Sequence, residues 1–330
     1  MDFEIRELPI NFKSSRDMIE KFLAENGLRM DVMDYYVGIF DENDELVAGG
    51  GTADNVIKCI AVMKDLREYN LAGMLITRLR EHVRSSKQEN VFIFTKAENE
   101  DIFRNLSFFT VGKTDRTVMM ESNPWGIKRY VKYLGSFAGE GVNGAIVMNC
   151  NPFTLGHRYL IEQSAKQVDR LHVILVKEGK TMFPYEDRLA LVKKGTAHLE
   201  NVDVIEGSSY VISTATFPNY FIKNLDEISE AQVKLDLDVF IRHIAPALKL
   251  KVRFMGSEPL DPLTALYNKK MHELLPAAGI EAVEVSRKEI DGQPVSASRV
   301  RKAIVTKDME TVRKLVPPTT LEYIMEHEFQ

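Results

Sequence analysis

The sequence predicts an α/β protein in which an α+β domain precedes a domain with a parallel sheet. The chain has 330 residues, which at about 150 residues per domain allows two domains. From Ala145 onward, apolar strand-like segments alternate with helix-like segments, as in a parallel sheet with right-handed crossovers. Residues 135–144 contain four glycines and few large side chains. We therefore predict a boundary there, with domains 1–135 and 136–330.

In the first domain, Ser14 and Ser15 predict a capping box before a helix that runs to about Glu25 and stops at Gly27. A helix is also predicted to begin at Ser122-Asn123-Pro124, because proline is tolerated in a first turn. The other predicted elements are strands 35–41 and 45–49 joined by a hairpin, strand 56–62, helix 71–83, and strands 91–95 and 118–121.

The second domain shows five apolar strand-like segments with helical segments between them. The predicted strands are 145–149, 171–176, 202–206, 251–256 and 280–286. The predicted helices are about 157–169, 186–198, 228–248 and 262–275. In such a fold, ligands bind at the carboxyl ends of the strands.

Composition narrows the class of protein. The chain has 43 basic and 48 acidic residues and a net charge of −5, which argues against nucleic acid as a partner. The amino-terminal residues are too acidic for a signal peptide, and the longest apolar runs have about six members, so no membrane span is expected. Only Cys59 and Cys150 occur, which fits a reducing compartment. We expect a cytoplasmic protein.

The most informative segment is 145–157, AIVMNCNPFTLGH. A strand ends at Met148, a turn follows, and Gly156 and His157 open a helix whose free N–H groups point at a ligand above the strand. Gly156 allows a ligand close to the backbone, and Thr154 and His157 can both donate to an anion. This pattern predicts a phosphate site without a Walker lysine. In the alternative interpretation, His157 caps the helix and Gly156 is a packing residue.

The segment Thr154–His157 resembles the (H/T)xGH signature of the nucleotidyltransferase superfamily. The second signature of that superfamily, (I/V)S(S/A)(S/T)xxR, matches Val295–Arg301, about 140 residues downstream. Ser296 and Ser298 can cap a helix and hold the β- and γ-phosphates of ATP, while Arg301 adds a planar cationic fork. Alone, that segment reads as an ordinary helix cap with a surface arginine; paired with the first motif it indicates an ATP site.

A weaker match in the segment 183–191 adds Arg188, and Lys177 ends the preceding strand. Each is either an ATP contact or a helix-start or surface charge. The predicted ATP-binding residues are Asn149, Phe153, Gly156, Lys177, Arg188, Ser296, Ser298 and Arg301.

Three segments, 145–162, 253–268 and 295–304, resemble one family of this superfamily in particular, the citrate lyase ligases. That family places a GNAT-like domain before a Rossmann-like nucleotidyltransferase domain. The GNAT loop pattern (R/Q)xxGx(G/A) keeps Arg67 and Ala72 here but has Asn70 where glycine belongs. A side chain there crowds the backbone that would cradle a pyrophosphate, so we predict no acetyl transfer from acetyl-CoA by the first half.

The resemblance implies an ATP-dependent, AMP-forming acid–thiol ligase. Acetate attacks the α-phosphate of ATP, and acetyl-adenylate then acetylates the thiol of a phosphoribosyl-dephospho-CoA arm on the citrate lyase acyl-carrier subunit, which activates the lyase. His157 and Thr154 would act at the α- and β-phosphates as the catalytic residues. ATP would carry Mg²⁺ on its phosphates, with no protein metal site.

Two other interpretations share these motifs. A nucleotidyltransferase would join AMP to a phosphorylated vitamin-like acceptor, and a binding module would only sense ATP. The hydroxyl- and aromatic-rich segment 207–220 is either an acetate or pantetheine pocket or a plain loop.

Overall fold

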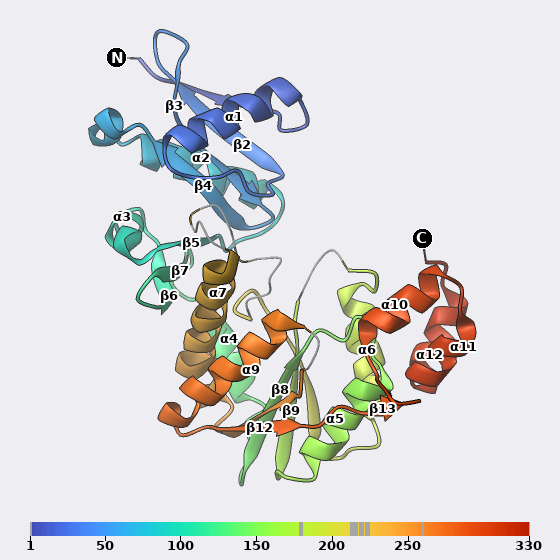
Figure 1. Ribbon diagram of the computed structural model, residues 1–330. Coiled ribbons are helices and arrows are strands. Elements are labelled where there is room, and N and C mark those ends of the chain that lie inside the picture. Colours follow the sequence, from blue (N-terminus) through green and yellow to red (C-terminus); the bar gives the residue numbers. More distant parts are fainter. Residues whose placement is uncertain are drawn as a thin grey trace. The chain divides into compact units, whose positions relative to one another are not determined.

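The computed structural model describes residues 2–177, 181–211, 217, 221, 225–258 and 261–329 (Figure 1). Contacts within the chain divide it into two compact units. The first unit comprises Met1–Lys128 with Thr214–Asp238, and the second comprises Arg129–Ser213 with Val239–Gln330. The predicted domain limits at 135 and 136 stay a prediction. None of the helices in the described part of the chain is long and apolar enough to cross a membrane.

The first unit contains a mixed seven-stranded sheet with the order β1-β2-β3-β4-β5-β7-β6, in which only the β4–β5 pair is parallel. The strands are β1 (Glu4–Glu7), β2 (Tyr35–Phe40), β3 (Leu46–Ala53), β4 (Val56–Val62), β5 (Phe92–Lys96), β6 (Phe109–Lys113) and β7 (Thr117–Glu121). The helices are α1 (Lys13–Glu25), η1 (Lys64–Tyr69), α2 (Leu71–Ser85), η2 (Ala97–Asn99), α3 (Glu100–Asn105) and α7 (Leu225–Val239), whose last residue belongs to the second unit. This is the α+β architecture that the sequence predicted.

Helix α2 is held to the sheet by one apolar face. Leu71, Leu75 and Leu79 recur at helical spacing and are at most 1% exposed. They pack in one core with buried residues of β2 and β3 such as Val37 and Val47. Burial of each such leucine contributes roughly 1.5–3 kcal/mol, which fixes the helix on the sheet.

Two predicted helix starts are wrong. Helix α1 begins at Lys13, its N-cap is Phe12, and no side chain caps it, so Ser14 and Ser15 lie inside the first turn rather than before it. Helix α4 (Gly126–Gly135) begins later than Pro124, because the Asn123 carboxamide accepts from the Trp125 N–H and forms a turn there. The predicted stop of α1 is confirmed: Gly27 has φ +73°.

Asn70 occupies the position before α2 where the resemblance expects glycine. Its φ is +55°, the left-handed conformation that glycine adopts most readily, so the asparagine supplies the same backbone geometry. A Cβ atom on Gly73 would lie only 2.5 Å from the Oδ1 atom of Asn70. The carboxamide therefore fills space beside the first turn of α2.

The second unit contains a five-stranded, fully parallel sheet with the order β10-β9-β8-β11-β12. The strands are β8 (Asn143–Met148), β9 (Arg170–Leu175), β10 (Val202–Glu206), β11 (Leu250–Gly256) and β12 (Glu281–Val285), and a separate hairpin pairs β13 (Glu289–Ile290) with β14 (Gln293–Pro294). The helices are α5 (Leu155–Ala165), α6 (Tyr185–Thr196), η3 (Phe240–Ile244), α8 (Ala245–Ala247), α9 (Pro262–Leu274), η4 (Pro276–Ala278), α10 (Ala297–Val305), α11 (Met309–Leu315) and α12 (Pro318–Glu326). All five predicted strands are confirmed.

The helix predicted over 228–248 is interrupted. It is α-helical to Val239, π-helical over Phe240–Ile244, and ends in the short α8. Pro246 explains the change, because it has no N–H to donate to the preceding turn and its ring needs extra room there.

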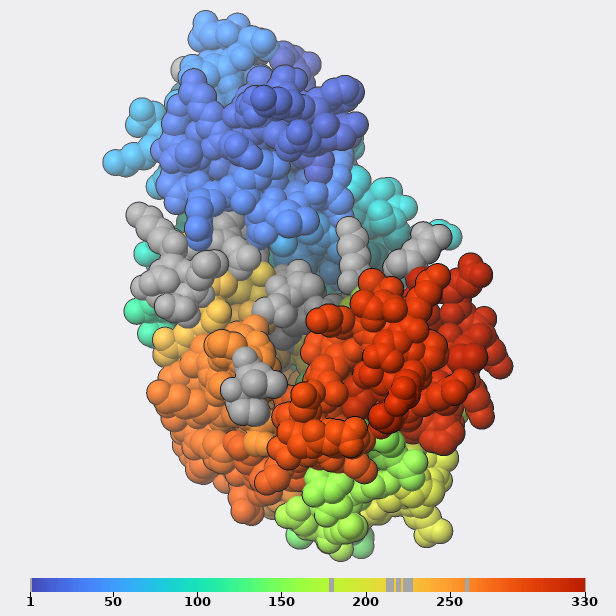
Figure 2. All heavy atoms as spheres, turned by 45° about the vertical axis from the view of Figure 1, so that its right-hand side comes forward, coloured from blue at the N-terminus to red at the C-terminus, as the bar shows by residue number. Residues whose placement is uncertain are grey.

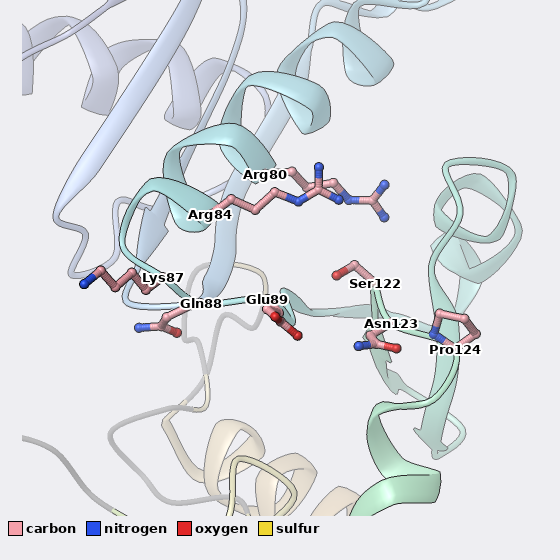
Figure 3. Close-up of a pocket in the computed structure, with 8 residues that line it drawn as sticks. All are labelled: Arg80, Arg84, Lys87, Gln88, Glu89, Ser122, Asn123 and Pro124. Atoms are coloured by element: carbon pink, nitrogen blue, oxygen red, sulfur yellow. The ribbon is translucent and has the colours of Figure 1, made fainter.

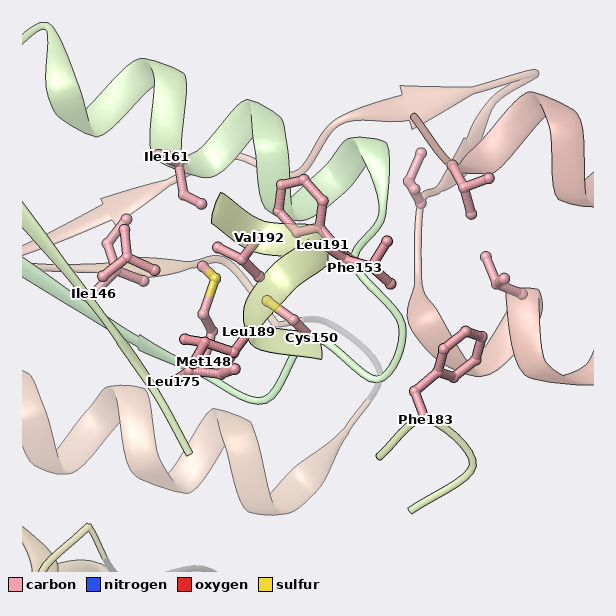
Figure 4. Packing of buried hydrophobic residues seen from close by; sticks show 14 of the residues in the cluster. Ile146, Met148, Cys150, Phe153, Ile161, Leu175, Phe183, Leu189, Leu191 and Val192 are labelled. Carbon is pink, nitrogen blue, oxygen red and sulfur yellow. The ribbon is translucent and has the colours of Figure 1, made fainter. Parts of the chain in front are cut away.

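The core of the second unit fixes the loop after β8. Phe153 is fully buried and points toward α6, where Leu191 and Val192 surround it (Figure 4). A Cβ on Gly195 would approach the Phe153 ring to 2.3 Å, so only glycine lets α6 come this close. In Figure 2, residues 261–329 of the second unit, drawn in orange to red, form much of the face that is turned toward the viewer.

Candidate active site

The candidate site lies where the strand order of the second unit reverses. The chain passes from β8 to β9 and β10 on one side, and returns to β11 and β12 on the other. The carboxyl ends of β8 and β11 therefore flank the crevice in which open parallel sheets bind ligands. The segment that follows β8 carries Thr154 and His157, and the segment that follows β11 carries Ser257 and Glu258.

Two contacts join the sequence motifs that lie about 140 residues apart. A Cβ on Gly156 would lie 3.0 Å from the carbonyl oxygen of Val295, so Gly156 lets the two backbones meet. The Arg301 guanidinium donates through Nη1 to the carbonyl oxygen of Asn151 at 2.5 Å. These two contacts hold the amino-terminal ends of α5 and α10 close to each other.

Thr154 and His157 form a reciprocal cap at the start of α5. The Thr154 hydroxyl accepts from the His157 N–H at 3.3 Å, and His157 Nδ1 accepts from the Thr154 N–H at 3.1 Å. The structural alternative, a capping histidine, is therefore present. It involves only Nδ1: because that atom accepts a backbone proton, the neutral ring carries its own proton on Nε2, which remains a donor.

Burial, and to a smaller extent the nearby positive charge of Arg287, lower the pKa of His157 to about 4. The imidazole is therefore neutral at pH 7. It can donate one hydrogen bond to a phosphate oxygen, but it does not arrive as a cationic general acid.

This lowered pKa predicts a pH dependence of stability. The unfolded chain binds a proton at His157 below about pH 6.5 and the folded chain only below about pH 4, so the free energy of unfolding should fall as pH drops through this window. Denaturant unfolding at pH 7 and pH 5 would measure the effect. His157→Asn should lose this part of the pH dependence; an unchanged pH slope in the variant would contradict the lowered pKa.

Ser296 and Ser298 lie at the start of α10. Ser296 is the N-cap, and its hydroxyl accepts from the Arg299 N–H at 3.3 Å. Ser298 is the second residue of the helix rather than its cap; it is exposed, and its hydroxyl lies 3.1 Å from that of Ser296. The pair therefore presents hydroxyl groups next to the free N–H groups of a helix start.

Arg188 is fully buried, which its sequence context did not reveal. It donates through Nη1 to the backbone and side-chain oxygens of Asn149, both at 2.5 Å, and through Nε to Phe183 O at 3.1 Å. It therefore positions Asn149 and the end of β8. Lys177 is exposed at the end of β9, with its ammonium 5.8 Å from the Tyr185 ring centroid.

Sequence reasoning missed Arg287 and Glu258. Arg287 follows β12, donates through Nε to Ser257 O at 2.6 Å, and forms an ion pair with Glu258, whose side chain is 5% exposed. Its positive charge contributes to the lowered pKa of His157, so Arg287 lies near the segment that carries His157. Their position directly after adjacent parallel strands was the available signal.

Cys150, beside the first motif, is 1% exposed, and burial raises the pKa of its thiol. Cys59 is also buried, with a pKa raised to about 12. We expect neither thiol of the folded chain to react with an aromatic disulfide reagent, and Cys150→Ala to keep acetyl transfer. Rapid labelling of Cys150 in the folded chain, or loss of transfer in a folded variant, would indicate that the Cys150 thiol takes part in the reaction.

Most of the segment 207–220 lies outside the described residues, because 212–216 and 218–220 are not described. Within the described residues, no group of three or more His, Cys, Asp or Glu side chains is placed to hold a metal ion.

Comparison with known proteins assigns the chain to a family. Residues 143–324 match the model of the citrate lyase ligase C-terminal domain. The chain is 42% identical to a [citrate [pro-3S]-lyase] ligase from Escherichia coli K12, over 94% of this chain and 92% of that protein. It is 40% identical to the ligase of the same name from Klebsiella pneumoniae, over 95% and 94%. The chain belongs to the citrate lyase ligase family.

Solved structures resemble parts of this family member. Thermotoga maritima TmcAL, bound with α-thio ATP, matches 56% of this chain and 55% of its own at 14% identity and a TM-score of 0.35. A GNAT-family acetyltransferase from Staphylococcus aureus Mu50 matches 37% of this chain and 100% of its own at 12% identity and a TM-score of 0.29. Each of these two structures matches only part of this chain.

Proposed function

We propose that this chain acetylates the thiol of the phosphoribosyl-dephospho-CoA arm on the citrate lyase acyl-carrier subunit, at the expense of ATP, and so activates the lyase. Membership of the ligase family supports the overall reaction. The observation that carries the site is the contact of Gly156 and Arg301 with Val295 and Asn151, which unites two anion-binding helix starts at the end of β8.

The proposed reaction has two steps. An oxygen of acetate attacks the α-phosphorus of ATP, the bond to the β-phosphate oxygen breaks, and pyrophosphate leaves with that electron pair. The carrier thiolate then attacks the acetyl carbonyl, and AMP leaves. Both nucleophiles belong to substrates, so the protein supplies position and charge stabilisation rather than a covalent residue.

Each site residue has a role in this scheme. Neutral His157 donates from Nε2 to the α- or β-phosphate, with Thr154 fixing its ring. Ser296, Ser298 and Arg301 hold the leaving pyrophosphate, and Mg²⁺ bound to the ATP phosphates would neutralise part of their charge. Asn149, Phe153 and Gly156 form the base of the proposed ATP site. Arg188 holds Asn149 in place through its hydrogen bonds, and Lys177 lies at the edge of the site.

We also propose residues 1–135 as a GNAT-like domain and 136–330 as the nucleotidyltransferase-like catalytic domain. Because the acceptor is a free thiol, the reaction needs a reducing compartment, and we propose the cytoplasm. Both cysteines of the chain are free thiols, which is compatible with that environment.

The decisive experiment is exchange of labelled pyrophosphate into ATP. The proposal expects exchange that depends on acetate, followed by release of AMP and an acetylated carrier thiol. Exchange that needs no acetate, with a dinucleotide product from a phosphorylated acceptor, would instead establish a nucleotidyltransferase.

Arg287 offers a further prediction. Arg287→Gln removes a cation next to the phosphate site, and we expect kcat/KM for ATP to fall about tenfold. The same change should raise the pKa of His157, because Arg287 disfavours its protonation. NMR titration of His157 measures this shift. The control is Lys288→Gln, at the half-buried position next to Arg287, whose charge does not contribute to the pKa shift of His157. An unmoved His157 pKa would remove Arg287 from the site.

A further inference from the structure

A cation-lined cavity lies in the first unit, at the carboxyl-terminal end of α2, away from Asn70 (Figure 3). Its volume is about 570 Å³, in the range of small-molecule sites. One wall is the last turns of α2 and the residues after it, and the other is the end of β7. It is lined by Arg80, Arg84, Lys87, Gln88, Glu89, Ser122, Asn123 and Pro124.

Three cations line this cavity against one carboxylate, Glu89. Arg80 and Arg84 lie four residues apart on one face of α2, where like charges repel. Within the described residues, no ion pair is formed by Arg80, Arg84 or Lys87. Figure 3 shows both guanidinium groups extending over Ser122 and Asn123.

The Arg80 side chain is held in place by its contacts, but one of its hydrogen-bond donors has no acceptor. Its Nη2 donates to Ser107 O at 2.9 Å, and its guanidinium lies 4.2 Å from the Phe108 ring centroid. Its Nε–H is buried and has no hydrogen-bond partner. A buried donor without an acceptor is costly, so the hydrogen-bonding capacity of the Arg80 guanidinium is only partly used in this structure. The dipole of α2 accounts for cations in its last turn, but not for Arg80, which lies further back.

The opposite wall also presents donors. The Ser122 hydroxyl oxygen accepts from the Val91 N–H at 3.0 Å, which leaves its proton to donate into the cavity. The Asn123 Oδ1 atom accepts from the Trp125 N–H at 3.0 Å, which directs the amide nitrogen of Asn123 away from that contact. Donors from two walls suit a tetrahedral anion with several oxygens better than a two-oxygen carboxylate.

We propose that this cavity of the first unit binds a phosphate group, with Arg80, Arg84 and Ser122 as its principal donors. The phosphate is carried either by the CoA-type arm of the carrier or by a free phosphate compound. Only the first source rests on the proposed function; the phosphate site does not.

The single tryptophan of the chain provides a local probe. Trp125 follows the cavity residues Ser122–Pro124 directly and is 61% exposed. Full-length protein should be titrated with inorganic phosphate and, separately, with dephospho-CoA, by calorimetry and by Trp125 fluorescence. We expect saturable binding at millimolar or lower concentration.

The variant that tests the site is Arg84→Gln, because Arg84 is exposed and its loss should leave the fold intact. Affinity should fall about tenfold or more, as for a lost charge-assisted hydrogen bond. Arg78→Gln is the matched control: it lies on the same helix and pairs with Glu81, outside this cavity. Absence of binding, or equal affinity in Arg84→Gln and the wild type, would overturn the proposal.

Carrier kinetics separate the two sources. If the arm is the ligand, dephospho-CoA should bind at the cavity and Arg84→Gln should raise KM for the carrier, with acetate-dependent pyrophosphate exchange unchanged. If phosphate binding needs Arg84 but carrier KM does not, the ligand is a free phosphate compound. If the wild-type protein catalyses no acetate-dependent pyrophosphate exchange, the proposed ligase function is refuted, but the phosphate site is not.

Discussion

Replacement of His157 by alanine should lower acetate-dependent pyrophosphate exchange by about 10²–10³-fold, or roughly 3–4 kcal/mol of transition-state stabilisation. The reason is the fixed tautomer of the ring. Thr154 N–H occupies Nδ1, so Nε2 donates to developing phosphate charge without reorganisation. Initial exchange rates at saturating ATP and acetate measure the loss.

Alanine also removes half of the helix cap, so a second variant is needed. His157→Asn retains a short side chain that can accept from the Thr154 N–H, but it carries no donor at the position of Nε2. If both variants lose exchange equally and melt cooperatively, the Nε2 donor is responsible. Near-wild-type exchange in His157→Asn would reduce His157 to a capping residue.

Arg301→Lys should lower kcat/KM for ATP by about 10- to 100-fold, with KM for the carrier little changed. Arg301 already donates from Nη1 to Asn151 O, and the planar fork leaves further N–H groups for phosphate. A lysine ammonium is a point charge that can reach one of these partners but does not bridge both. Steady-state kinetics with ATP and with carrier varied in turn separate the two effects.

The matched control is Arg299→Lys in the same helix. Arg299 donates through Nη1 to Pro294 O at 3.0 Å, a contact within its own segment. The Arg299→Lys substitution should change kcat/KM for ATP by no more than about twofold, because Arg299 is a partly buried arginine whose side-chain hydrogen bond lies within its own segment. Unaltered ATP kinetics in Arg301→Lys would move Arg301 out of the ATP site.

The second unit could be predicted from sequence because its signals are redundant. The predicted strand 171–176, observed as Arg170–Leu175, is a short apolar run buried on both faces, and a turn and a periodic helix follow it. The TLGH and VSASRVR segments fell at a strand end and at helix starts, so their chemistry and their location were predicted together.

The parts that sequence did not predict depend on tertiary contacts. Strand β1, EIRE, is largely exposed and is a strand only because its backbone pairs with β2. Arg188 looked like a helix-start charge, yet it is buried because Asn149 and Phe183 supply acceptors from other segments. Arg287 belongs to no motif; its position after a predicted strand was readable, but its place beside Glu258 depends on the pairing of β11 with β12.

The contact between Gly156 and Val295 has a consequence for the timing of activity during synthesis. During synthesis, the first half of the proposed ATP site is present once residue 157 has emerged from the ribosome, but the second half, Val295–Arg301, is made about 140 residues later. Until then α5 presents its N–H groups without the serines and arginine that would hold a nucleotide. Unfinished and carboxyl-terminally truncated chains should therefore consume no ATP, and only a completed polypeptide can begin to modify the carrier.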